Sequence, residues 1–292
     1  MCGAFTRCCY RTIIQVHILP RWGTYRLADV RTVAVEDWLK ALDMANGSKA
    51  KIRNVFHTLF SHAERYEWHD RNPITKARQS AKRRRDPDIL DPAELTRLLV
   101  ALPEPFRTMV FVAAGTGLRR GELIGLKWGD VDFGAALIHP KRSIVNQHIG
   151  NLKTLASAKP VALDPYLAAA LANLKAQSLF KGLEDWVFAS PASAGKKPYW
   201  PDMVLKRRVK PIAFALGIVK QIGWHSFRHT YASLLKASGV DVKVVQDSLR
   251  HANARITMDL YTQALMPDKR LAQSKVIEMV RPKLMLPAVA VA

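Results

Sequence analysis

Three side chains that carry or can acquire a positive charge lie within five residues of one another in the stretch "GWHSFRHTYASLL", residues 223–235. They are His225, Arg228 and His229. A spacing of three residues places His225 and Arg228 on one face of a helix. The stretch has the pattern of the first turn of a buried helix, where the backbone dipole is itself positive and disfavours added cations. Positive side chains gathered at such a place indicate an anionic ligand.

Four more polar residues interrupt apolar faces in the second half of the chain. Arg119 follows a Gly-Thr-Gly turn at a helix start, and Lys153 lies near a turn between two strands. His251 stands where one helix ends, and Tyr261 comes ten residues later on the next. Taken singly, each has an ordinary structural explanation. A helix-start arginine or a hairpin lysine usually faces solvent, a tyrosine at helical spacing usually belongs to the core, and His225 could cap its helix.

The charge balance narrows the class of ligand. The 292 residues include 45 lysines and arginines against 24 aspartates and glutamates, a formal net charge of +21. An excess of this size favours a nucleic-acid partner. A membrane surface is the main competitor, but no apolar run approaches the roughly 20 residues that span a bilayer, so no membrane partner is predicted. Up to Asp86 there are 17 basic and 8 acidic residues, so both halves share the excess.

The cysteines indicate which cellular compartment and which metal sites are compatible with the sequence. Cys2, Cys8 and Cys9 all lie in the first ten residues. They form neither a disulfide framework nor a zinc pattern, because no further cysteine pair or histidine cluster lies at ligand spacing. We therefore expect no metal site and a reducing compartment, the cytoplasm.

Helical periodicity dominates residues 10–78. Apolar residues at helical spacing occur in "TVAVEDWLKAL" and in "SKAKIRNVFHTLFSHAERYEW", for which Ser48 is the expected N-cap. Lys49, Lys51 and Arg53 crowd the start of the second of these helices and are candidate nucleic-acid contacts. The pattern predicts a helical domain over residues 1–80.

A basic stretch, "KARQSAKRRRDPDILDP", separates the two halves. It contains Arg83, Arg84 and Arg85, two prolines and no apolar periodicity, which is typical of a linker. We place the linker at residues 81–90. Two interpretations remain: a plain solvated linker, or a basic strap across a phosphate backbone.

The second half, residues 91–292, predicts a domain of mixed structure. Asp91 is the expected N-cap of its first helix, with Pro92 at the first helical position and Glu94 completing a capping box. Two helices joined by the Gly-Thr-Gly turn follow. Residues 136–164 then predict three short strands, "ALIHP", "SIVNQHIGNLKT" and "KPVALD", before helices return. The expected fold class is mainly α with a small antiparallel β-sheet.

Three segments, in order, resemble the three sequence blocks of the tyrosine recombinase (phage integrase) family. They are "GTGLRRGELIGLKWGDVD", "HSFRHTYASLL" and "LRHANARITMDLYTQ". The resemblance covers about residues 90–275, and "ILPRWGTYRLADVRTVAVEDWL" is similar to the core-binding domain of integrases. It implies a helical, SAM-like core-binding domain followed by a mixed α+β catalytic domain.

The resemblance also implies an activity. Members of the family cleave and rejoin duplex DNA through a 3′-phosphotyrosyl intermediate, without metal, ATP or other cofactor, and no Gly-x-x-x-x-Gly-Lys-Ser/Thr segment is present here. They act as tetramers on DNA, in the cytoplasm and on the nucleoid, with accessory DNA-bending or directionality factors in some cases. Carried over to this chain, the catalytic set is Arg119, Lys153, His225, Arg228, His251 and the nucleophile Tyr261.

Phosphodiester chemistry explains why these residue types are needed. Two arginines can clamp the non-bridging oxygens, where negative charge develops. A phenol with a reference pKa of about 10 needs a base or a cationic pocket, and the resemblance gives the base to His251. It also implies that His225 donates to a phosphate oxygen and that Lys153 protonates the leaving 5′ oxygen.

Four positions near these blocks need separate comment. Lys159 lies six residues after Lys153 and is the alternative lysine. Arg250 occupies the position where the family usually has glycine, and it is expected either to shift the following histidine or to contact a phosphate. Glu122 is placed to orient an arginine, and His229 is interpreted as structural. The candidate DNA contacts are thus Lys49, Lys51, Arg53, Arg83, Arg84, Arg85 and Arg250.

The two ends of the sequence add further expectations. The N-terminal segment is short for an integrase, which indicates a truncated copy or a misplaced start. The apolar end, Leu284 to Ala292, is expected to pack on a neighbouring protomer. The alternatives to a recombinase are a catalytically impaired DNA-binding remnant and an enzyme similar to type IB topoisomerases.

Overall fold

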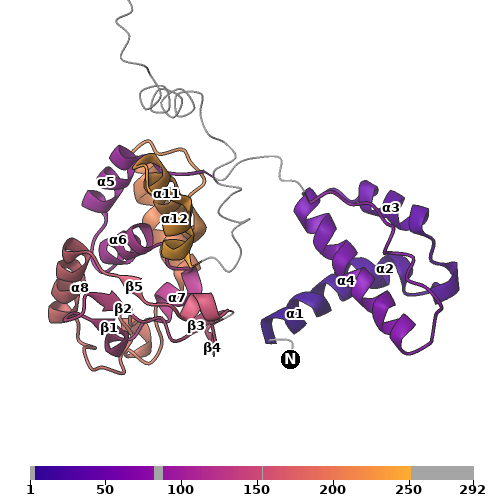
Figure 1. The fold of residues 1–292 in the computed structure, drawn as a ribbon, viewed down its shortest axis with the longest axis horizontal. Coiled ribbons are helices and arrows are strands. Elements are labelled where there is room, and N and C mark those ends of the chain that lie inside the picture. Colours follow the sequence, from indigo (N-terminus) through magenta and orange to yellow (C-terminus); the bar gives the residue numbers. More distant parts are fainter. Residues whose placement is uncertain (1–3, 82–87, 153, 251–292) are drawn as a thin grey trace, which may run out of the picture. The chain divides into compact units, whose positions relative to one another are not determined.

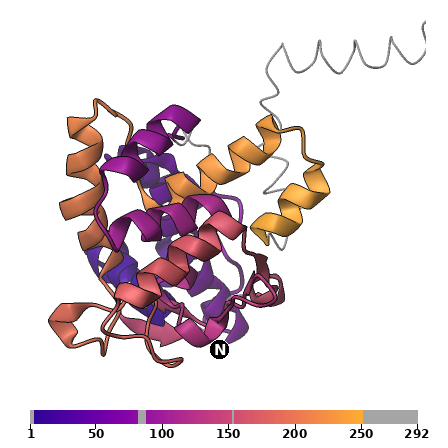
Figure 2. The same ribbon diagram turned by 90° about the vertical axis from the view of Figure 1, so that its left-hand side faces the viewer.

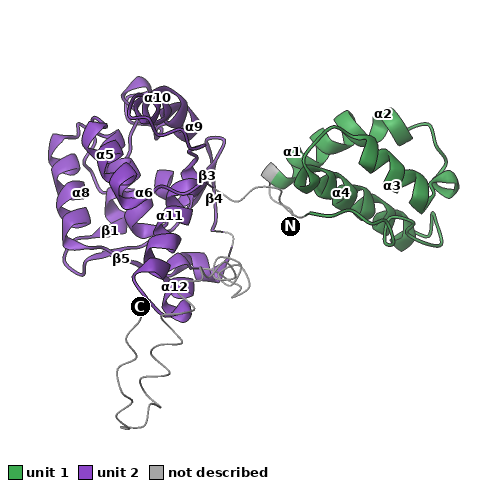
Figure 3. Cartoon of the chain, turned by 90° about the horizontal axis from the view of Figure 1, so that it is seen from above, with its two compact units in different colours: residues 1–86 green, residues 87–292 purple. Residues whose placement is uncertain are grey.

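The structure, a computed structural model, describes residues 4–81, 88–152 and 154–250. The chain divides into two compact units, residues 1–86 and residues 87–292 (Figure 3). Each unit has a hydrophobic core of its own.

The regular elements in the described part of the first unit are all helical (Figure 1). Its elements are α1 (Ala4–Ile13), the π-helical stretch η1 (Ile14–Ile18), α2 (Leu19–Trp22), the 3-10 turn η2 (Leu27–Asp29), α3 (Thr32–Ala41) and α4 (Asn46–Arg65). The first three form one continuous run. The π-helical stretch ends two residues before Pro20, whose nitrogen cannot donate to the helix ladder and whose ring crowds the preceding turn. The wider turn accommodates the proline without ending the helix.

Aromatic side chains fill the core of the first unit. Trp22, 5% exposed, lies 5.8 Å from the ring of Trp38 and 5.8 Å from that of Phe56. In α3, Val35 and Leu39 from the helically spaced apolar residues of "TVAVEDWLKAL" are both fully buried. These apolar contacts fix how α2, α3 and α4 pack.

The start of α4 differs from the sequence expectation. The helix begins at Asn46, with Ala45 in the N-cap position and no side-chain cap hydrogen bond. Ser48 therefore lies inside the first turn, and its amide donates to the carbonyl of Ala45 at 2.8 Å. The prediction of Ser48 as N-cap was wrong, because the backbone enters the helix before the apolar stripe begins and the N-cap is Ala45.

The second unit is mainly α-helical in its described part. Its helices are α5 (Pro92–Ala101), α6 (Phe106–Thr116), α7 (Arg120–Ile124), α8 (Pro165–Gln177), α9 (Pro201–Val204), the π-helical stretch η6 (Leu205–Val209), α10 (Lys210–Ala215), α11 (Trp224–Ala237) and α12 (Val242–Leu249). The expected capping box of α5 is confirmed, since the amide of Glu94 donates to Asp91 Oδ1 at 2.8 Å and the amide of Asp91 donates to Glu94 Oε2 at 2.9 Å. As in the first unit, the π-helical stretch precedes a proline, Pro211.

Helix α6 lies at the centre of the second unit's core. Its residues Met109, Val110 and Val112 are fully buried, and the helix packs against α5, α8 and α11 (Figure 1). Helix α12 packs on α11 at one edge of the unit, where α11 and α12 are the orange-to-yellow helices of Figure 2. A smaller apolar cluster between these two helices includes Val245 and Leu249.

Two small antiparallel sheets complete the second unit. Strands β1 (Val131–Asp132), β2 (Leu137–Ile138) and β5 (Val161–Ala162) form one sheet in the order β1-β2-β5, and β3 (Ser143–Val145) pairs with β4 (His148–Gly150). The fold class expected from the sequence, mainly α with a small antiparallel sheet, is confirmed.

The middle of the three predicted strands is in fact a hairpin. Asn146 and Gln147 both have positive φ, 49° and 61°, which is the backbone of a two-residue turn between antiparallel strands. Val145 faces His148 across it. The sequence "SIVNQHIG" shows no glycine at this turn, so the usual hairpin signal was missing.

The hairpin approaches α7 closely at Gly121. A Cβ built there would lie 2.4 Å from Ser143 Oγ and 2.8 Å from the carbonyl oxygen of Ile144. Gly121→Ala should therefore force α7 and β3 apart and destabilise the protein by roughly 1–3 kcal/mol, measured by chemical denaturation. The matched control is Gly47→Ala in α4, where a Cβ would have nothing within 4 Å; its effect should stay within about 1 kcal/mol. Equal effects of the two substitutions would contradict the close packing.

Candidate active site

A left-handed glycine sets the position of Arg119. Helix α6 ends at Thr116, and Gly117 follows with φ 61°. A Cβ at this glycine would lie 2.7 Å from the ring of Tyr231, so the chain turns tightly beneath α11. Arg119 is then the N-cap residue of α7. It is partly exposed, with 31% of its side chain accessible.

Glu122 holds Arg119 in place by two hydrogen bonds. The amide of Arg119 donates to Glu122 Oε2 at 3.0 Å, and its Nη1 donates to Oε1 at 2.9 Å. The carboxylate is only 3% exposed. Burial raises the pKa of Glu122, but the charge of Arg250 and the hydrogen bonds from Arg119 outweigh burial and hold the pKa below its ordinary value. The expectation that Glu122 orients an arginine agrees with these contacts.

Arg228 on α11 is a buried cation. It is 6% exposed, and its two terminal nitrogens donate to the carbonyl oxygens of Gly117 and Leu249. Burial, together with the positive charge of Arg119, lowers the pKa of Arg228 to about 9, so the guanidinium stays protonated at neutral pH. His225, one turn earlier on the same helix, is exposed.

The two histidines of this helix lie on one face. The ring of His225 lies 6.3 Å from that of His229, as expected for residues four apart on a helix. Because His229 follows Arg228 directly, the sequence alone suggested that it points to another face of the helix. Helical geometry explains the difference, because a residue at i+4 returns to the side of residue i.

Arg250, expected to contact DNA, is instead buried in the described structure. Its side chain is 1% exposed. Nη2 donates to Glu122 Oε2 at 2.6 Å and Nη1 donates to the carbonyl oxygen of Ser157 at 2.8 Å. Burial lowers the pKa of Arg250, partly offset by the charge of Glu122. This arrangement does not offer the guanidinium to a phosphate at the surface, because the carboxylate already occupies it.

A short turn that follows Lys153 in the sequence contributes two hydroxyl groups to this cluster. Thr154 caps the 3-10 turn η4 (Leu155–Ala158), and its Oγ1 lies 3.0 Å from Ser157 Oγ. Ser157 Oγ also accepts from Arg119 Nη1 at 2.9 Å. The sequence interpretation missed both hydroxyl residues. The signal that could have found them was the Thr-x-x-Ser spacing directly after Lys153, which is typical of a local cap.

The expected site residues divide into those brought together and those outside the described part. Arg119 and Arg228 converge around Glu122, with His225 near them on α11. Lys153, His251 and Tyr261 lie outside the described residues, as do Arg83, Arg84 and Arg85 and the C-terminal tail from Leu284. The alternative lysine, Lys159, is 60% exposed and its Nζ lies 3.6 Å from Asp247 Oδ1.

The three basic residues at the start of α4 differ in their availability. Lys51 is exposed. Lys49 Nζ donates to the carbonyl oxygen of Lys40 at 2.9 Å. Arg53 donates from Nη2 to the carbonyl oxygens of Ile74 and Thr75, both at 2.9 Å, so it holds the segment after α4 against that helix. Arg53 therefore has a structural role that its sequence context did not indicate.

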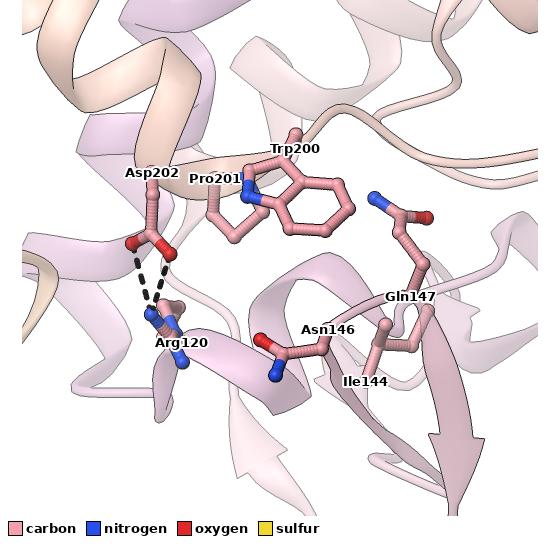
Figure 4. Close-up of a pocket in the computed structure, with 7 residues that line it drawn as sticks. All are labelled: Arg120, Ile144, Asn146, Gln147, Trp200, Pro201 and Asp202. Carbon is pink, nitrogen blue, oxygen red and sulfur yellow. Dashed lines mark hydrogen bonds and ion pairs between the residues drawn. The ribbon is translucent and has the colours of Figure 1, made fainter.

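Arg120, the neighbour of Arg119, faces a different environment. Its Nη1 donates to both carboxylate oxygens of Asp202, at 2.8 and 3.0 Å. The pair borders a small pocket between the β3–β4 turn and the start of α9, where the indole of Trp200 stands beside Asn146 (Figure 4). Two consecutive arginines thus point to separate sites, because α7 begins between them.

The buried cluster carries an excess of positive charge. Among the described residues, three guanidinium groups, Arg119, Arg228 and Arg250, surround the one carboxylate of Glu122, which gives this set of side chains two more positive charges than negative ones. Planar guanidinium groups match the oxygens of a phosphate. In the described part of the chain, no group of three His, Cys, Asp or Glu side chains could hold a metal ion. The arrangement can bind an anion at the exposed edge of Arg119.

Comparison with known proteins identifies the class. The phage integrase family model matches residues 88–267, so the chain belongs to the phage integrase family. A tyrosine recombinase of Pseudothermotoga lettingae is 28% identical over 259 residues, covering 86% of this chain and 84% of that protein. The integrase of Salmonella phage P22 is 33% identical over 217 residues, covering 70% of this chain and 50% of its own length. The function is site-specific DNA recombination, and the resemblance found in the sequence is confirmed.

Solved structures agree on the fold. The Tn1549 transposon integrase in complex with a circular intermediate DNA superimposes with a TM-score of 0.78 at 16% identity, covering 94% of each chain. A lambda integrase dimer bound to a COC′ core site superimposes with a TM-score of 0.65 at 20% identity, covering 88% of each chain. No helix in the described residues is both long and apolar enough to cross a membrane.

Proposed function

We propose that this chain cleaves one strand of duplex DNA with Tyr261 and then passes the strand end to a new partner. The phenolate oxygen attacks the scissile phosphorus, the bond to the 5′ oxygen breaks, and that oxygen leaves with a proton as a hydroxyl. The DNA 3′ end is then held as a phosphotyrosine. A 5′-hydroxyl of another strand reverses the reaction, so the bond energy is conserved and no ATP or metal is required.

The observation that carries the proposal is the cluster around Glu122. Within the ranges that the structure describes, its three guanidinium groups face one carboxylate, and one of the three, Arg119, is partly exposed. In a site shielded from water, such fixed cations stabilise the charge that develops on phosphate oxygens. Arg119 and Arg228 are assigned to those oxygens, and His225 is assigned as a further donor.

Lys153 is preferred over Lys159 as the acid for the leaving oxygen. Its neighbour Thr154 is tied to Ser157, which in turn accepts from Arg119. Lys159 instead pairs with Asp247. A lysine among arginines loses its proton more readily than one in water, which suits an acid that must protonate an alkoxide. His251 is assigned as the base for Tyr261.

Both units are proposed to bind duplex DNA. The excess charge is distributed over both, with 17 basic and 8 acidic residues up to Asp86, and solved relatives are described in complex with DNA. Residues 1–80 would form the core-binding domain, 81–90 a basic linker and 91–292 the catalytic domain. Lys51 and the linker arginines are the favoured phosphate contacts, since Lys49 and Arg53 already bind backbone carbonyls.

Assembly and location complete the proposal. Recombination between two duplexes requires four cleavages, which four protomers can supply, and we assign the tail from Leu284 to contacts between them. Accessory DNA-bending or directionality factors would act on the same complex. The place of action is the nucleoid in the cytoplasm.

Covalent trapping tests the proposal with a pool of DNA sequences in place of a single defined target site. The protein is incubated with duplexes that carry a randomised core and a nick just downstream, so that the short 5′-hydroxyl fragment is lost after cleavage. The expected result is a covalent protein–DNA adduct that resists detergent, whose DNA-linked peptide contains Tyr261. Adducts should form equally well with a metal chelator present.

Two results would overturn it. An adduct on another residue would refute the assignment of Tyr261. DNA binding that weakens with salt but yields no adduct from any pool would identify a binding remnant instead. Sequencing the trapped duplexes also supplies the substrate for the measurements below.

A further inference from the structure

The backbone at Arg250 adopts a conformation that arginine rarely takes. Arg250 ends α12 with φ 53° and ψ 46°, in the left-handed region. Glycine adopts this region without a steric cost, whereas a residue with a Cβ is strained there. A strained conformation persists only when surrounding contacts hold it in place. The contacts of the Arg250 side chain are therefore the part of the structure that needs an explanation.

Those contacts join three separate parts of the second unit. Nη2 of Arg250 donates to Glu122 on α7 at 2.6 Å, and Nη1 donates to the carbonyl oxygen of Ser157 at 2.8 Å. The side chain is 1% exposed. Arg250 thus connects the end of α12 to the helix that carries Arg119 and to the turn that follows Lys153.

The backbone of the same turn receives both candidate phosphate-binding arginines. The carbonyl oxygen of Leu249 accepts from Arg228, and that of Arg250 accepts from Arg119 Nη2 at 3.4 Å. A shift of this turn would therefore move hydrogen-bond partners of both arginines.

We propose that Arg250 is a positioning residue for strand cleavage, which fixes the end of α12 against Glu122 and Ser157. In this role it orients Arg119 and Arg228, and it does not bind the DNA itself. The inference rests on the proposed function, because orientation matters only if these arginines bind the scissile phosphate. The alternative role is a direct contact between Arg250 and a phosphate. Nε would make this contact, since that atom has no hydrogen-bond partner among the described residues.

The test compares wild type with Arg250→Gly and Arg250→Lys on the duplex recovered by trapping. Glycine fits the left-handed backbone, so the first variant removes the contacts without adding strain. We expect adduct formation at saturating DNA to slow about tenfold, the effect of losing charged hydrogen bonds. The DNA concentration for half-maximal rate, and the dependence of binding on salt, should not change. Lysine keeps the charge beside Glu122 and should restore part of the rate.

Two comparisons separate this role from a general loss of structure. Lys243→Ala, which removes a 69% exposed side chain from the same helix, should leave the rate unchanged. Combined with Glu122→Gln, the loss caused by Arg250→Gly should be less than additive, because both act through one contact. If the glycine variant does not fold, the rate of adduct formation by Arg250→Lys relative to wild type tests the inference. A rate equal to that of wild type would contradict it.

Each other outcome has a defined meaning. A wild-type rate in Arg250→Gly would overturn the inference. If the salt dependence of DNA binding becomes shallower in Arg250→Gly by about one phosphate contact, Arg250 binds DNA directly. This result would also overturn the inference. No adduct with wild-type protein would instead refute the proposed function, which keeps the two failures distinguishable.

Discussion

Arg228→Lys should slow DNA cleavage at saturating DNA by roughly 100- to 1,000-fold, the range found when one donor to a developing oxyanion is lost. The guanidinium of Arg228 already uses two nitrogens to hold the carbonyl oxygens of Gly117 and Leu249. It can still present its remaining N–H donors to a phosphate. A lysine ammonium is a point charge with three donors and cannot span this geometry.

The measurement is the rate of adduct formation on the trapped duplex, with the folded fraction checked by circular dichroism. Arg120→Lys is the matched control, since Arg120 pairs with the half-exposed Asp202 away from the cluster. Its rate should stay close to that of wild type. A similar loss in both variants would show that the effect does not depend on the position of Arg228 and would contradict the prediction.

Glu122→Gln should destabilise the second unit by about 3–5 kcal/mol, the usual cost of removing one partner from a buried ion pair. The substitution leaves Arg250 and Arg119 without their shared counter-charge. Hydrogen-exchange mass spectrometry on peptides from α7 and α11 measures the change in opening free energy within this unit. The control is Glu184→Gln, whose carboxylate is 89% exposed beside Lys127; it should change stability by less than about 1 kcal/mol.

The ionisation of Glu122 also predicts how the stability of the second unit changes with pH. The pKa of Glu122 in the folded protein lies below its ordinary value of 4.5, so the folded state favours the ionised form. Its contribution to stability is complete above about pH 4.5 and is lost as the pH falls through the lower folded value. Wild type should therefore lose protection in α7 and α11 on acidification below pH 4.5, and Glu122→Gln should lose less. An equal loss in both proteins would assign the acid sensitivity to other groups.

Sequence patterns predicted those features that depend on residues close together in the sequence. The capping box of Asp91 and Glu94 formed as expected, because both partners lie within one helical turn. The burial of Val35 and Leu39 followed from helical spacing alone. The start of α4 was predicted less well, since its N-cap is Ala45 and not Ser48. The turn at Asn146 and Gln147 was missed because residues other than glycine adopted the left-handed conformation.

The sequence by itself determined the family, the order of its three blocks and the strongly basic character of the chain, since these depend on residue identity and spacing. Only the tertiary structure decided what each arginine binds. Arg53 reaches carbonyls more than twenty positions away along the chain, and Arg250 meets a carboxylate 128 positions away. Spacing carries no information about such partners, because burial and hydrogen bonding at that range are fixed by how helices pack. For this reason Arg250, whose charge predicted a DNA contact at the surface, is instead buried and paired with Glu122.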